Sequence, residues 1–356
     1  MKIHCIAVLL LLQSIPAGAQ APASSSWRED FDFFWNTINE EYAYFGKKQT
    51  DWTRVKTIYG PMADTVNSRA AFTGIIEQAL YELYDAHCNL NTNTPQSSRL
   101  VPTGTDCWAE YINGKPIITE VRMHSGAATC GIKAGMEVLA INGIPVDEAV
   151  RKALPRSLRA TDIAALSFTL RRLLAGNHVT LRRFTLRDKN RTAEFYPDQN
   201  GMWLETSHYT GKISTHMYND VGFLRINNCL YDNDLVAVFD STMQAMQHTK
   251  GLIIDLRETP SGGNTLVARA ILSWFTKKEV FYQKHEYTAE EQQSGIKKCW
   301  EEMVSPRPGK YYDRPVVILV NHWTGSIAEA ITIAFDSFKR PHTFIVGTTM
   351  ARLNGA

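Results

Sequence analysis

From about residue 198 onward, short runs of mostly apolar residues alternate with segments of helical periodicity. The runs cover Val221–Ile226, Gly251–Leu256 and Pro315–Val320. A run without regular polar alternation is typical of a strand that is buried on both faces. Helices that alternate with such strands supply the cover, so the pattern predicts an α/β core. We expect its helices over residues 232–248, 264–275 and 326–338.

The segment from residue 27 to residue 90 has a helical pattern throughout. Asp51 is a suitable cap for a second helix, which we expect to end at Gly60-Pro61. A third helix is expected from about Ser68. The pattern predicts a small helical bundle.

Residues 100–197 carry strand and turn signals instead. Asn142-Gly143 is a strong tight-turn signal that separates an apolar strand from a helix beginning at Val146. This order, with Ala127-Ala128 and the stretch Ala134–Gly143, resembles a PDZ domain, which is a β-rich fold. We therefore expect a multidomain α/β protein with a leader at 1–20, a helical domain at 21–95, a PDZ-like domain at 96–197 and an α/β core at 198–356.

The first residues have the pattern of a signal peptide. Lys2 is followed by the apolar run Ile6–Leu12 and by the small-residue stretch Pro16–Gln20. This run is shorter than the roughly 20 residues that a membrane-spanning helix needs. We expect a protein without a stable membrane span, exported to the periplasm or the extracellular space, and a bacterial source.

Charge and cysteine content exclude several classes of function. The formal net charge is +2, which gives no field that would favour nucleic acid. The basic stretch from Arg182 to Arg191 could be a phosphate-binding patch, but its alternation favours a hairpin with one solvated face. Five cysteines follow the leader, an odd number without a CxxC pair, so neither a disulfide framework nor a zinc site is expected. An oxidising compartment would still permit one or two bridges, whose pairing the sequence does not assign. No metal or organic cofactor is implied.

Two junctions between a strand and a helix carry the residues that chemistry would need. In the first, Asp255–Asn264, the pair Gly262-Gly263 can bring free amide groups to a bound anion at a helix N-terminus. In the second, Ser326 lies where the next apolar strand gives way to a helix. A serine there is either a nucleophile at the edge of the sheet or only a helix N-cap.

Together the two junctions resemble the tail-specific, C-terminal processing (S41-type) serine peptidases, whose nucleophile lies in a Ser-Ala-x-Glu segment. The counterpart here is Ser326–Glu329. By this resemblance Ser326 attacks the scissile carbonyl. The backbone amide of Ile327, with one from Gly262 or Gly263, would form the oxyanion hole, and Glu329 would have a structural role.

The resemblance also suggests the general base. One branch of the family uses a lysine about two dozen residues after the serine, but this chain has no lysine after Lys339, and Arg352 cannot replace one because its guanidinium stays protonated. The tricorn-like branch uses a histidine in a Leu-x-Asp-Gly-His segment, which His87 matches within Leu83–Leu90. A neutral imidazole can accept the proton of a serine hydroxyl.

The family pattern normally continues with further strands and, in the tricorn-like branch, an acidic residue. The sequence stops at Ala356 without them. The resemblance therefore implies either a fragment or a shortened relative, active or inactive.

Two hypotheses follow. The first is an exported serine endopeptidase that cleaves proteins or peptides by acyl transfer, with the PDZ-like domain capturing the substrate through its free C-terminus as an added strand. The second is a catalytically inactive protein that binds peptides or apolar ligands on the same scaffold, as interphotoreceptor retinoid-binding proteins do.

Overall fold

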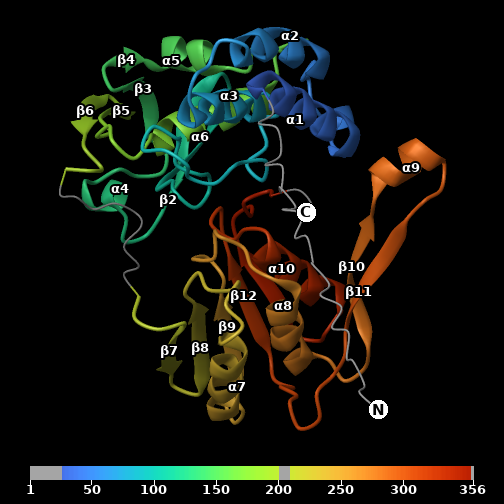
Figure 1. Cartoon of the computed structure of the whole chain (residues 1–356). Coiled ribbons are helices and arrows are strands. Elements are labelled where there is room, and N and C mark those ends of the chain that lie inside the picture. Colours follow the sequence, from blue (N-terminus) through green and yellow to red (C-terminus); the bar gives the residue numbers. More distant parts are fainter. Residues whose placement is uncertain (1–25, 200–208, 354–356) are drawn as a thin grey trace, which may run out of the picture.

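The structure is a computed structural model that describes residues 26–199 and 209–353. The expected leader at residues 1–20 lies outside the described residues. Figure 1 shows two bodies, which we call the N-terminal body (residues 26–199) and the C-terminal body (residues 209–353). Among the described residues, no helix combines the length and the apolar character needed to cross a membrane.

The helical bundle expected at the N-terminus is present. Its helices are α1 (Trp27–Glu41), α2 (Trp52–Ala63) and α3 (Arg69–Tyr81). Ser26, Asp51 and Ser68 cap them by accepting backbone N–H groups with their side chains. The expected end of α2 at Gly60-Pro61 is wrong, because the helix continues to Ala63 with the proline inside its last turn. A proline there removes only one helical hydrogen bond.

The rest of the N-terminal body is built on an antiparallel sheet. Its strands are β1 (Cys107–Ile112), β2 (Lys115–Val121), β3 (Glu137–Ile141), β4 (Ile144–Pro145), β5 (Phe184–Asp188) and β6 (Arg191–Phe195), in the order β1-β2-β3-β5-β6 with β4 beside β3. The helices that accompany it are α4 (Gly126–Thr129), α5 (Val146–Ala153) and α6 (Ile163–Ala175). The tight turn is confirmed, since Asn142 and Gly143 both have positive φ angles, of 51° and 82°.

The basic stretch does form the expected hairpin, with Asp188 opposite Arg191. Arg182 does not lie on a solvated face, however. It is 2% exposed and precedes Phe184 on the side of the strand that enters the core. The expectation of a solvated face is therefore wrong for this residue, because partners distant in sequence compensate its charge.

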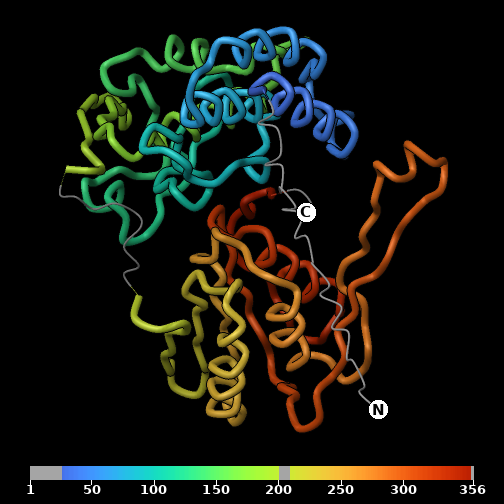
Figure 2. The backbone as a smooth tube through the Cα atoms, in the orientation of Figure 1, coloured from blue at the N-terminus to red at the C-terminus, as the bar shows by residue number. Residues whose placement is uncertain are grey.

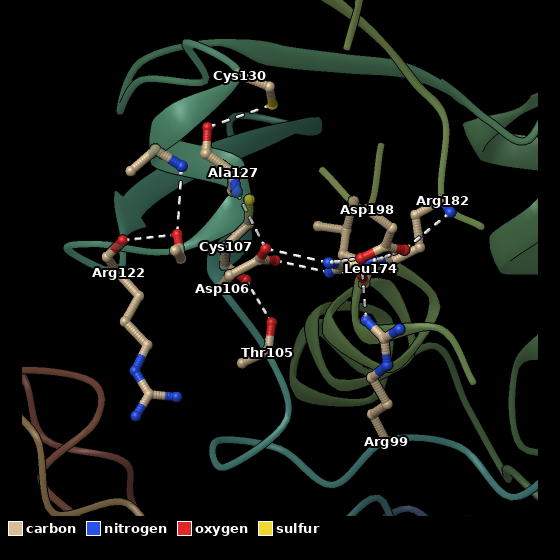
Figure 3. A network of polar contacts seen from close by, with 12 residues as sticks. Arg99, Thr105, Asp106, Cys107, Arg122, Ala127, Cys130, Leu174, Arg182 and Asp198 are labelled. Atoms are coloured by element: carbon tan, nitrogen blue, oxygen red, sulfur yellow. Dashed lines mark hydrogen bonds and ion pairs between the residues drawn. The ribbon is translucent and has the colours of Figure 1, made fainter. Parts of the chain in front are cut away.

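Those partners are the carboxylates of Asp106 and Asp198 (Figure 3). Nη1 of Arg182 donates to Oδ1 of Asp106, and Nη2 donates to Oδ1 of Asp198, each at 2.6 Å. Burial alone would raise the pKa of Asp198, but the hydrogen bonds and charge of Arg182 outweigh it and hold the pKa below its usual value. Arg99 approaches the same Asp198 at 3.5 Å, so the side chains form one buried ionic network.

The C-terminal body is the expected α/β core. Its sheet has the order β13-β12-β9-β8-β7, and only the outer pair β7-β8 is antiparallel. The strands are β7 (Ile213–Tyr218), β8 (Val221–Ile226), β9 (Gly251–Asp255), β12 (Val316–Val320) and β13 (Thr343–Gly347). The helices are α7 (Leu235–Met246), α8 (Thr265–Leu272), which continues as the short 3-10 helix η2 (Ser273–Phe275), and α10 (Ile327–Ser337).

Helices cover one face of this sheet. Leu224, Ile254 and Ile318 stand side by side on the covered face and are fully buried, and α8 contacts both α7 and α10 there. The chain passes from β8 to β9, then to β12 and then to β13, and each step moves to the next strand in the same direction across the sheet. Right-handed crossovers that move in one direction place their helices on the same face of the sheet. On the opposite face Phe223 and Ile253 are only half-buried. Helical cover of both faces, as expected from the sequence, is therefore not found in the described residues.

A hairpin arm extends from the C-terminal body. It consists of β10 (Val280–Glu286), α9 (Thr288–Ser294) and β11 (Cys299–Val304), and Figure 1 shows it rising toward α1. The hydroxyl of Tyr287 in the arm donates to Oε2 of Glu41 at 2.5 Å.

Buried contacts also join the two bodies near their centre. The indole N–H of Trp323 donates to the carbonyl of Thr105 at 2.8 Å, although 218 residues separate them. Figure 2 follows the chain from the blue helices to its red final segment, which ends between the bodies.

Candidate active site

The two junctions lie next to each other because β9 and β12 are neighbouring parallel strands. Beyond the strand ends the loops stay paired, since the amide of Thr259 donates to the carbonyl of Trp323 and the amide of Gly325 donates to the carbonyl of Thr259. These hydrogen bonds measure 3.1 and 3.3 Å. The extended pairing brings Gly262 and Ser326 into contact.

Ser326 has the backbone conformation of a strained turn. Its φ angle is 55° and its ψ angle is −114°, immediately before the first residue of α10. Such a conformation costs a non-glycine residue about 1–3 kcal/mol and is found mainly where function requires it. The amide of Ser326 donates to Oε2 of Glu329 at 2.9 Å. The residue is thus the N-cap by position, and its hydroxyl is directed elsewhere.

The hydroxyl of Ser326 meets His87. Oγ lies 3.5 Å from Nε2 of the imidazole, although the residues are 239 positions apart. This distance is at the long end of a hydrogen bond, which is common for catalytic pairs without a substrate.

His87 occupies a turn that follows α3. Its backbone amide donates to Oδ1 of Asp85 at 3.0 Å, and the hydroxyl of Tyr42 donates to Oδ2 of the same carboxylate at 2.7 Å. Asp85 is 5% exposed. The buried carboxylate therefore attaches the loop that bears the imidazole to the helical bundle.

The glycine turn presses against the serine. Gly262 has a φ angle of 69°, and a Cβ atom on it would lie 2.7 Å from Cβ of Ser326. A Cβ atom on Gly263 would lie 2.4 Å from the carbonyl of Leu230. Neither position has room for a side chain, and the positive φ of Gly262 is one that glycine adopts readily.

Three backbone amides near the hydroxyl are available as donors. Within residues 26–199 and 209–353, the N–H groups of Gly262, Gly263 and Ile327 donate to no other protein group. Ile327 begins α10, where the helix dipole favours negative charge. Donors held at a helix N-terminus can stabilise an oxyanion that forms at the substrate carbonyl.

Glu329 fastens the end of the described chain to the site. Its carboxylate accepts the amides of Ser326, Arg352 and Leu353 at 2.9, 3.0 and 3.1 Å. Burial raises the pKa of Glu329, while these amides oppose the rise. The side chain of Arg352 points to Glu110 instead, with Nη1 4.0 Å from Oε1.

The N-terminal body supports the glycine turn through a buried ion pair that sequence reasoning did not find. Nη2 of Arg122 lies 2.8 Å from Oε2 of Glu258, and Nη1 donates to the carbonyl of Thr103 at 3.0 Å. The hydroxyl of Thr103 contacts the carbonyl of Pro260 at 3.4 Å. Arg122 and Glu258 are 136 residues apart, so no local pattern could have paired them.

The described residues hold no evident metal centre. No group of three or more His, Cys, Asp or Glu side chains in these ranges is placed to bind a metal ion. Within the described residues, all five cysteines are free thiols: Cys88, Cys107, Cys130, Cys229 and Cys299.

Comparisons with known proteins agree with the expected family. The sequence model of peptidase family S41 matches residues 220–354, and the model of the tricorn protease C1 domain matches residues 24–80. No curated protein matches the chain significantly in sequence.

Solved structures share the fold at low sequence identity. Mature CPAF complexed with lactacystin has a TM-score of 0.57 at 16% identity, over 93% of this chain and 85% of that chain. The photosystem II D1 C-terminal processing protease has a TM-score of 0.52 at 15% identity, over 92% of this chain and 82% of that chain. The chain is therefore similar to peptidase family S41 in its α/β body and to the tricorn protease C1 domain in its first helices.

Proposed function

We propose that this protein is a serine endopeptidase that cleaves proteins or peptides by acyl transfer, with Ser326 as nucleophile and His87 as general base. The observation that carries the proposal is the 3.5 Å approach of Ser326 Oγ to His87 Nε2, beside the unpaired amides of the glycine turn. The match of residues 220–354 to the model of a peptidase family supports the same reaction class.

The proposed reaction has two halves. His87 Nε2 takes the hydroxyl proton as Oγ of Ser326 attacks the peptide carbonyl, and the amides of Ile327 and of Gly262 or Gly263 bind the resulting oxyanion. The imidazolium then protonates the leaving amine, which departs and leaves an acyl ester on Ser326. Water attacks the ester while His87 takes its proton, and that proton passes to Oγ of Ser326 as the acyl–oxygen bond breaks and the acid product leaves.

Labelling with a fluorophosphonate probe tests the nucleophile. We expect the wild-type protein to be labelled and Ser326→Ala to remain unlabelled, because the probe reacts only with an activated hydroxyl. Ser68→Ala is the matched control, since Ser68 is also the N-cap residue of a helix. Ser68→Ala should be labelled like the wild type. Equal labelling of the Ser326→Ala variant would contradict the assignment.

The glycine turn gives a second prediction. Gly262→Ala places a methyl group against Ser326 and should lower kcat by about 10²–10³-fold, the effect of losing one oxyanion donor. Gly295→Ala is the control, because Gly295 also has a positive φ, of 73°, with no neighbour within 4 Å of its added Cβ. Peptide hydrolysis should therefore be nearly normal in Gly295→Ala. An equal loss of kcat in both variants would mean that backbone strain at a positive φ is responsible, and a nearly normal kcat in Gly262→Ala would contradict the role proposed for the glycine turn.

The second candidate function is a catalytically inactive protein that binds peptides or apolar ligands. It is favoured by a cavity of about 290 Å³ beside the candidate pair, lined in part by Tyr111, Ile163 and Phe168. A folded wild-type protein that binds peptides but takes no fluorophosphonate label would support it.

We also propose export through the leader at residues 1–20. We propose the same division into domains as the sequence predicts: a helical domain (21–95), a PDZ-like domain (96–197) and a catalytic core (198–356). In this proposal the PDZ-like domain captures the C-terminus of the substrate by strand addition.

A further inference from the structure

Tyr84 has a backbone conformation that tyrosine rarely adopts, with a φ angle of 36°. Its amide donates to the carbonyl of Tyr81, the last residue of α3, at 3.0 Å, so Tyr84 lies where the helix ends. A left-handed residue at the end of a helix is usually glycine, because a Cβ atom makes this conformation costly. A large side chain at such a position needs compensating contacts, and this one lies three residues before His87.

The hydroxyl of Tyr84 makes two of these contacts. Tyr84 is 5% exposed, and its hydroxyl donates to Oδ2 of Asp162 at 2.7 Å and accepts the amide of Gln49. Burial and the hydrogen bond to Asp162 raise the pKa of Tyr84, so the hydroxyl keeps its proton and remains a donor at neutral pH. Asp162 is itself fixed in place, because its side chain caps α6 by accepting the amide of Ala164 at 2.8 Å.

Lys48 holds the backbone of the same residue. Its Nζ donates to the carbonyl of Tyr84 at 3.4 Å and lies 4.5 Å from the centre of the Tyr84 ring. The next residue, Asp85, attaches the loop to Tyr42 at the end of α1. Contacts with α6 and with α1 therefore both determine the direction in which the chain leaves α3 toward His87.

The contact between His87 and Ser326 leaves little tolerance for movement of this loop. Nε2 and Oγ are 3.5 Å apart, which is already at the long end of a hydrogen bond. A change of φ or ψ at residue 84 would displace the residues that follow, and with them the imidazole. A misplacement of about 1 Å can cost about 10²-fold in rate.

We propose that Tyr84 is a positioning residue for the general base: the bond from its hydroxyl to Asp162 holds the strained turn that directs His87 at Ser326. The inference rests on the proposed peptidase function and extends it from the catalytic pair to α6. Tyr84 and Asp162 act through His87 and take no part in making or breaking bonds.

Tyr84→Phe tests this role, because it removes the hydroxyl and keeps the ring that lines the cavity of about 290 Å³. We expect kcat for peptide hydrolysis to fall by about 10–10²-fold and KM to stay within about twofold, since the base is displaced and the binding surface is kept. The kcat is expressed per folded molecule, with the folded fraction taken from urea denaturation of the same preparation. A purely structural role would leave this kcat unchanged.

Tyr312→Phe is the matched control. Tyr312 is 1% exposed, and its hydroxyl is hydrogen-bonded to the hydroxyl of Thr249 at 2.8 Å. The two residues precede β12 and β9, at the opposite end of these strands from Ser326. Its kcat per folded molecule should stay within about twofold of the wild type, although a buried hydrogen bond is lost here too. Equal losses of kcat in Tyr84→Phe and Tyr312→Phe would overturn the inference.

Substitutions of Asp162 test the same bond from its other partner. Serine and asparagine both cap a helix as well as aspartate does, so α6 keeps its cap in Asp162→Ser and in Asp162→Asn. The serine side chain is too short to serve Tyr84 as well, so Asp162→Ser should lose as much kcat as Tyr84→Phe. Asp162→Asn should keep most of the activity, because its amide oxygen still accepts the hydroxyl.

The double variant of Tyr84→Phe and Asp162→Ser should lose no more than about twofold beyond the larger single loss, because both changes remove one bond. Losses that multiply, or a normal kcat in Asp162→Ser, would overturn the inference. If Tyr84→Phe does not fold, the contrast between Asp162→Ser and Asp162→Asn still decides the outcome.

Failure of the peptidase proposal would look different. It would appear as absence of hydrolysis and of fluorophosphonate labelling in the wild-type protein, and it would overturn the positioning role as well. An active wild type with an unchanged kcat in Tyr84→Phe would overturn the positioning role alone.

Discussion

Replacing His87 with alanine is expected to lower kcat for peptide hydrolysis by about 10⁶-fold, and adding Ser326→Ala should then cause almost no further loss. The reason is that the base and the nucleophile act as one unit. Once the imidazole is absent, the hydroxyl has lost the group that lies 3.5 Å away and is proposed to take its proton. The measurement is kcat for both single variants and the double variant at saturating peptide.

His216→Ala serves as the control for the histidine replacement. His216 is exposed on β7, where its ring packs against Tyr218. Its replacement should leave kcat within about twofold of the wild type, because surface changes away from special features have small effects. Activity of His87→Ala within tenfold of the wild type would eliminate this histidine as the base.

The second large effect is expected on stability, from the buried network around Arg182 (Figure 3). Arg182→Met should lower the free energy of unfolding by about 3–5 kcal/mol, because it leaves Asp106 buried without its cation and Asp198 with only Arg99, at 3.5 Å. The side chains of Asp106 and Asp198 are both 0% exposed. Urea denaturation of the two proteins under identical conditions gives the difference.

Arg183→Met is the matched control. Arg183 is the next residue, but its side chain is 43% exposed and lies 3.7 Å from the equally exposed Glu194. Removing an exposed pair of this kind should cost at most about 1 kcal/mol. Equal losses in the two variants would mean that the buried network contributes no more than a surface contact.

The buried network around Arg182 also predicts how the stability of the protein changes with pH. Because the pKa of Asp198 is lowered in the folded state, its contribution is complete above the ordinary value of 3.8 and is lost as the pH falls through the folded-state pKa. Part of this acid sensitivity should disappear in Arg182→Met.

The α/β core could be predicted from sequence because strands that are buried in a sheet consist mostly of apolar residues. The apolar runs at 221–226, 251–256 and 315–320 correspond to β8, β9 and β12. Helical cover on one face only was not foreseen, since it depends on the direction in which successive crossovers step along the sheet.

The residues of the candidate site could be predicted from the sequence to different degrees. Ser326 and Gly262 follow consecutive central parallel strands of the sheet, so local pattern and topology together place them in contact. His87 comes from another body, and only the resemblance to a known family pointed to it.

Long-range ionic pairs could not be predicted. Arg122 and Arg182 look like ordinary surface arginines in the sequence, yet each is at most 9% exposed and meets a carboxylate. For Arg122 that carboxylate is 136 residues away, and no periodicity encodes such a partner.

If Ser326 and His87 act together as proposed, the 239 residues between them make hydrolysis a property of the assembled molecule. A nascent chain whose first helices have folded would then hold the proposed base without the nucleophile, and a liberated C-terminal fragment would hold the reverse. Mild denaturant that separates the two bodies should then abolish activity while the serine and the glycine turn are still intact.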